Sequence, residues 1–259
     1  MNVRSLLRKM LLPFLKRSKN FRYFVTRVRL YIDNRGLRKK RLSFYSSFIK
    51  KGDLCFDIGA NYGNRVDIFL SLGAKVIAIE PQVECIEFLK RKYGNKIAIE
   101  QKGAGAEPSI KDFYVCDASV LSSFSEDFKS DGIWSRGDFK LKDTRKIEIV
   151  TLDSLITKYG TPAFIKIDVE GFEAEVLKGL SQKINIISFE YTNNDSNEKL
   201  MTCIDQLLKI SNTILFNYSI EESMDLVLNQ WSGKEHFLDL IKTDEFTNTC
   251  GGDIYVKFT

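Results

Sequence analysis

From residue 52 onward, short apolar runs alternate with segments of helical periodicity, and this alternation constrains the fold more than any other feature. The apolar runs predict strands at 54–59, 76–80, 97–100, 164–168, 186–190, 213–217 and 253–257. The helical segments, several of them stopped by glycine, lie at 64–72, 82–93, 152–158, 173–180 and 197–210. Two further runs, 111–115 and 147–150, predict accessory strands around a polar loop. The pattern predicts an α/β fold, a doubly wound and mostly parallel sheet with helices on both faces.

Acidic residues end four of the predicted strands. Ligands of such sheets bind beyond the carboxyl ends of the strands, so the residues at these ends are the first candidates for a site. Here they are Asp57, Glu80, Asp168 with Glu170, and Glu190. We therefore expect several carboxylates to gather at one edge of the sheet.

The segment DIGANYG, residues 57–63, follows the first predicted strand and precedes a helix. Gly59 and Gly63 allow a tight turn and a close backbone approach to a ligand. The spacing departs from the GxGxxG of dinucleotide-binding proteins and places an acid, Asp57, in the turn. A carboxylate there is a poor neighbour for a pyrophosphate, but it suits a ligand with an ammonium and a sulfonium group.

Glu80 ends the second strand, 21 residues after Gly59, where an acid can accept hydrogen bonds from ribose hydroxyls. Together with the glycine turn, it predicts a site for S-adenosylmethionine (SAM). The alternative is that the glycines only make a tight turn between strand and helix.

The histidine and cysteine content excludes other chemistries. With His236 as the only histidine, a multi-histidine zinc site cannot be built. The five cysteines are scattered and form no CxxC pair, which indicates reduced thiols in a cytoplasmic protein. No apolar run near the amino terminus approaches the ~20 residues of a membrane span, and none has the form of a signal peptide.

Charge divides the chain into a basic arm, residues 1–51, and an acidic body, residues 52–259. The arm contains 16 Lys and Arg and one acid, whereas the body contains 23 basic and 33 acidic side chains. Apolar residues at helical spacing predict two amphipathic helices in the arm, at 6–14 and 21–32. Such a surface could hold the protein at the inner face of an anionic membrane, or it could pack on the body or on a partner subunit of an oligomer. The acidic body argues against nucleic acid as a partner.

Three segments resemble the hallmark blocks of the FkbM-type methyltransferases. They are DIGANYG at 57–63, IVTLDSL at 149–155 and FIKIDVEGFEAEVLKG at 164–179. The resemblance extends over about residues 52–257, leaves out the arm, and covers 193–248 poorly, where we expect acceptor specificity to reside. It implies a class I, SAM-dependent enzyme with a seven-stranded Rossmann-like sheet that methylates hydroxyls of polyketides, sugars or cell-surface glycans.

The resemblance also implies which residues hold the cofactor. The methionine part of SAM would lie against Asp57, Gly59, Ala60, Asn61 and Gly63. Glu80, with Pro81 beside it, would hold the ribose. Gly103 and Ala104, within 102–105, would enclose the adenine.

Carboxylates are the expected catalytic groups. Methyl transfer to a hydroxyl is an in-line displacement, so catalysis depends on positioning and on removal of the acceptor proton. We expect Asp168 to be the base, with Glu170 orienting it or the acceptor and Glu190 completing the arrangement. The same three acids could instead bind Mg²⁺, which prefers oxygen ligands. The structural alternative for Glu170 and Glu173 is that they supply negative charge at the start of the following helix.

The expected function is SAM-dependent O-methylation of a hydroxyl on a sugar, a glycan or a glycolipid precursor, in polysaccharide biosynthesis. An NAD-binding Rossmann protein is a weaker alternative, because it predicts a GxGxxG turn that the chain lacks. A non-catalytic SAM-binding or scaffold protein on the same fold is the other alternative. It predicts damaged motifs, whereas Asp57, Gly59, Gly63 and Glu80 are all present.

Overall fold

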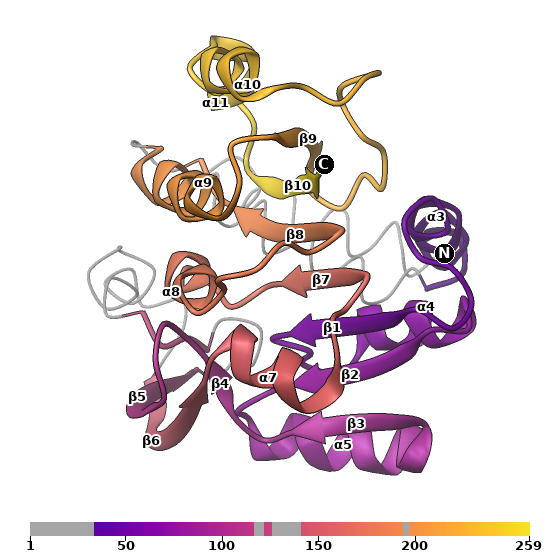
Figure 1. Ribbon diagram of the computed structural model, residues 1–259. Coiled ribbons are helices and arrows are strands. Elements are labelled where there is room, and N and C mark those ends of the chain that lie inside the picture. Colours follow the sequence, from indigo (N-terminus) through magenta and orange to yellow (C-terminus); the bar gives the residue numbers. More distant parts are fainter. Residues whose placement is uncertain (1–33, 117–121, 126–140, 194–196) are drawn as a thin grey trace, which may run out of the picture.

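The computed structural model describes residues 34–116, 122–125, 141–193 and 197–259. The predicted arm helices at 6–14 and 21–32 lie outside these residues. Seven strands form one sheet in the order β3-β2-β1-β7-β8-β10-β9 (Figure 1). They are β1 (Leu54–Ile58), β2 (Lys75–Ile79), β3 (Ile97–Glu100), β7 (Phe164–Ile167), β8 (Ile186–Tyr191), β9 (Ile214–Ile220) and β10 (Gly252–Phe258).

The first five strands of this order are parallel, and β10 runs antiparallel to both of its neighbours, β8 and β9. The expected doubly wound, mostly parallel, seven-stranded sheet is thereby confirmed. The parallel strands end at one edge, which places the ends of β1, β2, β7 and β8 next to one another.

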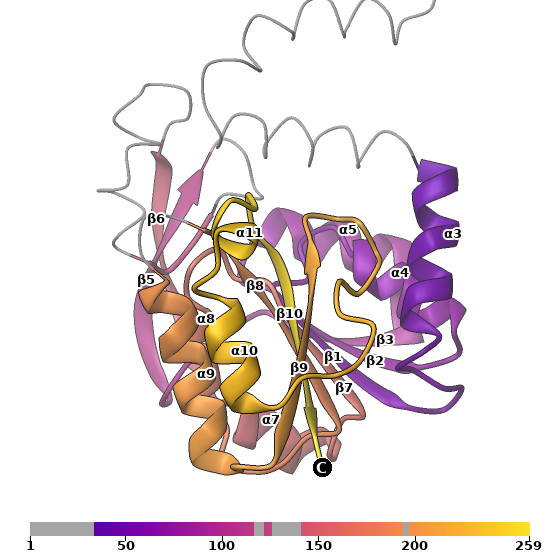
Figure 2. The same ribbon diagram turned by 90° about the horizontal axis from the view of Figure 1, so that it is seen from above.

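Helices cover both faces of the sheet (Figure 2). On one face lie α3 (Asn34–Tyr45), α4 (Asn64–Ser71) and α5 (Val83–Tyr93), whose buried side chains form one apolar cluster with the sheet. On the other lie α7 (Leu152–Tyr159), α8 (Glu173–Lys178), α9 (Glu198–Ile210), α10 (Lys234–Leu240) and α11 (Asp244–Thr247). Burial on both faces explains why the central strands are continuous apolar runs in the sequence.

A second sheet of three strands projects beside the first. It contains β4 (Gly103–Ala104), β5 (Ser109–Cys116) and β6 (Leu141–Val150), in the order β4-β6-β5. The predicted accessory strands at 111–115 and 147–150 are confirmed as parts of β5 and β6, which pair antiparallel.

Helix α3 belongs to the segment that charge assigned to the arm, yet it packs on the body. Tyr45 at its end is fully buried, and Phe48 just after it stacks on the rings of Phe164 and Tyr255. The basic side chains of α3 also pair with acids of the body, such as Arg38 with Asp67 at 3.0 Å. The packed body therefore begins before residue 52, where the charge of the chain changes.

None of the described helices has both the length and the apolar character that crossing a membrane requires. All five cysteines are free thiols.

Candidate functional site

The glycine turn after β1 packs directly against the end of β7. Gly59 has φ +83°, and a Cβ atom added to it would lie 1.9 Å from the carbonyl oxygen of Asp168. The Asp168 N–H in turn donates a hydrogen bond of 2.9 Å to the carbonyl oxygen of Ile58. Only glycine combines this backbone conformation with so close an approach. The turn at 57–63 and the candidate base are thus neighbours.

Glu80, after β2, organises the same turn. Its side chain is 2% exposed, and its two carboxylate oxygens accept the N–H groups of Asn61 at 2.7 Å and Gln82 at 2.8 Å. These bonds hold Asn61 in a left-handed conformation, φ +48°. Burial raises the pKa of Glu80 to about 7, against the effect of the two N–H donors. The contact of Glu80 with a ribose stays a prediction.

Asp57 lies beneath the turn, and one of its oxygens lacks a partner. The carboxylate is 2% exposed and accepts a hydrogen bond from the Val66 N–H, in the first turn of α4. Its Oδ2 atom has no hydrogen-bond partner among the described residues. Burial raises the pKa of Asp57 to about 7, although the cations Arg65 and Lys166 oppose this. A buried oxygen left unpaired is the kind of atom that a water or a bound ligand satisfies.

The loop between β7 and α8 is held in a strained shape. Glu170 has φ +55°, which a residue with a side chain rarely adopts. Glu173 Oε1 accepts the N–H groups of Val169 and Gly171, at 3.1 and 3.2 Å. Ser123 Oγ donates to the Glu170 carbonyl oxygen at 2.8 Å. Glu173, in the first turn of α8, therefore holds the loop that carries Glu170 through N–H groups that precede the helix.

Three expected catalytic acids meet at this edge. Asp168, Glu170 and Glu190 each offer a carboxylate oxygen within 4.8 Å of the other two, and all three residues are partly exposed. A cluster of this kind favours a cationic partner, either the sulfonium of a cofactor or a divalent metal ion.

Lys166 lies beneath the cluster, inside β7, and is 1% exposed. Its Nζ atom is 2.8 Å from Asp253 Oδ1 and 3.7 Å from Asp168 Oδ2. Burial alone would lower the pKa of Lys166, but the two carboxylates raise it overall, so the ammonium stays charged. A lysine in an otherwise apolar strand was a signal for pairing with an acid. No sequence signal identified the partner, Asp253 of β10, because 87 residues separate it from Lys166.

A second buried ion cluster was missed from the sequence. Glu222, after β9, accepts hydrogen bonds from Arg65 of α4 at 2.7 Å and from Arg41 of α3 at 3.0 Å. Burial alone would raise the pKa of Glu222, but the two arginines lower it to about 2. Arg65 follows the glycine turn by two residues, so this cluster supports the start of α4.

The other predicted cofactor residues lie in well-packed surroundings. Ala60 and Pro81 are buried beside the turn. Gly103 and Ala104 form β4, where a Cβ added to Gly103 would lie 2.5 Å from Phe124 Cζ. Their contacts with adenine stay a prediction. His236 is exposed on α10, a helix that packs against the edge strand β9.

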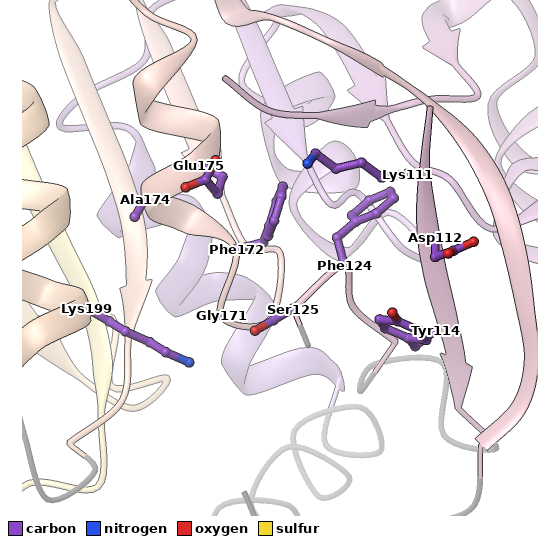
Figure 3. Close-up of a pocket in the computed structure, with 10 residues that line it drawn as sticks. All are labelled: Lys111, Asp112, Tyr114, Phe124, Ser125, Gly171, Phe172, Ala174, Glu175 and Lys199. Atoms are coloured by element: carbon purple, nitrogen blue, oxygen red, sulfur yellow. The ribbon is translucent and has the colours of Figure 1, made fainter. Parts of the chain in front are cut away.

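A pocket of about 450 Å³ opens beside the loop that carries Glu170 (Figure 3). It is lined by residues of β5, the 122–125 segment, α8 with the residues just before it, and α9: Lys111, Asp112, Tyr114, Phe124, Ser125, Gly171, Phe172, Ala174, Glu175 and Lys199.

A protein-family comparison matches residues 57–224 to the methyltransferase FkbM domain. This match spans the glycine turn, the acid cluster and the accessory sheet. The chain belongs to the FkbM methyltransferase family. Its mostly parallel sheet has the seven strands that the resemblance implied. Among curated proteins, no match was found.

Solved structures of methyltransferases align with the chain at low identity and with low TM-scores. Precorrin-6y C5,15-methyltransferase from Geobacter metallireducens is 10% identical, with a TM-score of 0.41 over 86% of this chain and 87% of that one. An rRNA methylase from Streptococcus thermophilus is 10% identical, with a TM-score of 0.40 over 83% and 92%. Aeropyrum pernix fibrillarin, solved with bound SAM, is 10% identical, with a TM-score of 0.41 over 81% and 68%. Values this low say nothing about the acceptor of the FkbM methyltransferase described here.

Proposed function

We propose that this FkbM methyltransferase transfers a methyl group from SAM to a hydroxyl of a sugar, a glycan or a glycolipid precursor. The observation that supports this proposal is the cluster of Asp168, Glu170 and Glu190 against the Gly59 turn. An alcohol is a weak nucleophile, and a base placed at the methyl group is what its methylation needs. The chain's one histidine is exposed on α10, which favours a carboxylate as that base.

The residues present fit SAM by the chemistry of their donor groups. When bound, SAM supplies an electrophilic methyl group on a positively charged sulfur. Asp57, Gly59, Ala60, Asn61 and Gly63 would hold its methionine part, Glu80 and Pro81 its ribose, and Gly103 and Ala104 its adenine. The acids near the turn compensate the positive charge, and the unpaired Asp57 Oδ2 adds a buried acceptor beneath the turn.

Asp168 would remove the proton of the acceptor hydroxyl. This proton would pass to the Asp168 carboxylate as the acceptor oxygen gains the methyl group that SAM supplies. The ammonium of Lys166, 3.7 Å away, would help to orient that carboxylate. Glu170 and Glu190 would orient the acceptor hydroxyl from the other side of the cluster.

Mg²⁺ offers a second route to the same proton loss. A divalent ion held by Asp168, Glu170 and Glu190 would lower the pKa of a coordinated hydroxyl. The closeness of the three carboxylate oxygens supports this variant of the proposal. It predicts loss of turnover on treatment with a chelator and recovery on addition of Mg²⁺.

Residues 1–33, the part of the basic arm that precedes α3, support a location in the cytoplasm at the inner face of the membrane, where glycolipid precursors are available. These residues carry nine Lys and Arg and one acid. Each cation near an anionic surface contributes roughly 1 kcal/mol to binding.

The first experiment is calorimetric titration of the full chain with S-adenosylhomocysteine (SAH), with NAD as the control, in the presence and absence of Mg²⁺. We expect micromolar binding of SAH and no binding of NAD. Failure of a folded, ligand-free preparation to bind SAH would overturn the proposal and favour a scaffold protein.

A further inference from the structure

The pocket beside the Glu170 loop has a cationic lining that methyl transfer itself does not require. Lys111 of β5 and Lys199 of α9 enter it from opposite sides, with the ring of Phe172 between them in Figure 3. Phe124 packs against Phe172 with ring centroids 5.6 Å apart, so these rings form an apolar wall. Two ammonium groups around an aromatic wall are a combination that suits an anionic, partly apolar ligand.

The two acids of the lining are each paired with a lysine outside it. Asp112 Oδ1 lies 2.9 Å from Lys146 Nζ, and its carboxylate points away from the pocket in Figure 3. Glu175 forms an ion pair with Lys178 on the same helix. Among the described residues, Lys111 forms no ion pair. Neither acid of the lining therefore offsets the positive charge that Lys111 brings to the pocket.

The pocket also shares its wall with the catalytic loop. Gly171, which lines it, directly follows Glu170, and a Cβ added to Gly171 would lie 3.5 Å from Lys199 Nζ. Ser125 lines the pocket too, and its N–H donates to Ser123 Oγ, the same hydroxyl that holds the Glu170 carbonyl. A ligand in the pocket would thus lie against the loop that carries a catalytic acid.

We propose that this pocket binds the anionic group of a sugar acceptor, a phosphate or a carboxylate, while the reactive hydroxyl lies at the Asp168–Glu170–Glu190 cluster. This inference rests on the proposed function and names the class of its substrate. The three acids repel an anion and the two lysines attract it, so the charges orient the acceptor with its hydroxyl toward the methyl group.

The test measures sugar binding by calorimetry on the full chain saturated with SAH. The probes are glucose 1-phosphate, glucuronic acid and glucose, which differ in their anionic group. We expect at least one anionic sugar to bind about tenfold more tightly than glucose. Lys111→Gln and Lys199→Gln should each remove most of this preference and leave SAH binding unchanged. Lys90→Gln, which removes the same charge from α5 outside the pocket, should leave the preference intact.

Comparison of the two anionic sugars shows which anionic group the pocket prefers. Preference for glucose 1-phosphate assigns a phosphate, and preference for glucuronic acid assigns a carboxylate. Equal binding of the three sugars, no binding of the anionic ones, or a preference that survives both lysine substitutions would overturn the inference. SAH binding in the same preparations tests the proposed function separately, because it does not involve the pocket.

Discussion

Asp168 is the residue on which the proposed chemistry depends most. It ends β7, its backbone touches the Gly59 turn, and its carboxylate faces both Lys166 and the two glutamates. Asp168→Asn keeps the shape and removes the base. We expect SAH formation from SAM, measured with a pool of sugar phosphates and uronic acids, to fall roughly 10²–10⁴-fold. SAH affinity should stay close to that of the unmodified chain.

Asp205→Asn is the matched control, since this acid is exposed on α9. It should leave turnover unchanged. Retained turnover in Asp168→Asn would remove Asp168 from the role of base and leave Glu170 or a metal ion to take it.

Gly59 is the second residue of the proposed site at which we expect no substitution to be tolerated. In Gly59→Ala, the new methyl group would meet the Asp168 carbonyl at 1.9 Å in a backbone conformation unfavourable to alanine. Strain of the left-handed conformation alone costs ~1–2 kcal/mol, and the clash adds to it. We expect a lower free energy of unfolding in urea and weaker SAH binding. Gly233→Ala, at a glycine with open space around it, should change neither.

At the scale of elements, Glu222 links the segment after β9 to α3 and α4 by ion pairs. Through Arg41 and Arg65 it joins three elements that the chain brings together from distant positions. Removing one partner of a buried ion cluster typically costs ~3–5 kcal/mol. We therefore expect Glu222→Gln to lower the free energy of unfolding by about that amount at neutral pH.

The pH dependence of this effect has a defined sign. The arginines lower the pKa of Glu222 from 4.5 to about 2, so its contribution is present above pH 4.5 and is lost as the pH falls toward 2. The difference in unfolding free energy between the unmodified chain and Glu222→Gln should shrink across this interval. A difference that stays constant down to pH 2 would show that the carboxylate charge does not stabilise these three elements.

At the scale of the whole molecule, the division of charge predicts where the protein resides. Deleting residues 1–33 removes nine Lys and Arg and one acid, and leaves α3 in the core. We expect the full chain to sediment with phosphatidylserine vesicles and the shortened chain to remain in the supernatant. High salt should release the full chain as well, because it screens surface charge. Equal sedimentation of both chains would favour packing of the arm on a protein surface.

Local pattern alone determined the class of fold and the edge of the sheet that carries the proposed site. Strand and helix periods follow from the order of apolar residues, and parallel strands bring their carboxyl ends to one edge. The meeting of Asp168, Glu170 and Glu190 could be predicted for this reason. Short elements with weak apolar period, α10 and α11, were not predicted, and α3 was hidden within a basic segment.

Only the tertiary structure decided which buried charges pair. The contact of Lys166 with Asp253 exists because β10 runs antiparallel beside β8, and Glu222 meets two arginines because α3 and α4 cover the same face. The anchoring of the Glu170 loop by Ser123 likewise depends on the accessory sheet. Such contacts join residues dozens of positions apart, and their energy depends on burial, which no local run of sequence specifies.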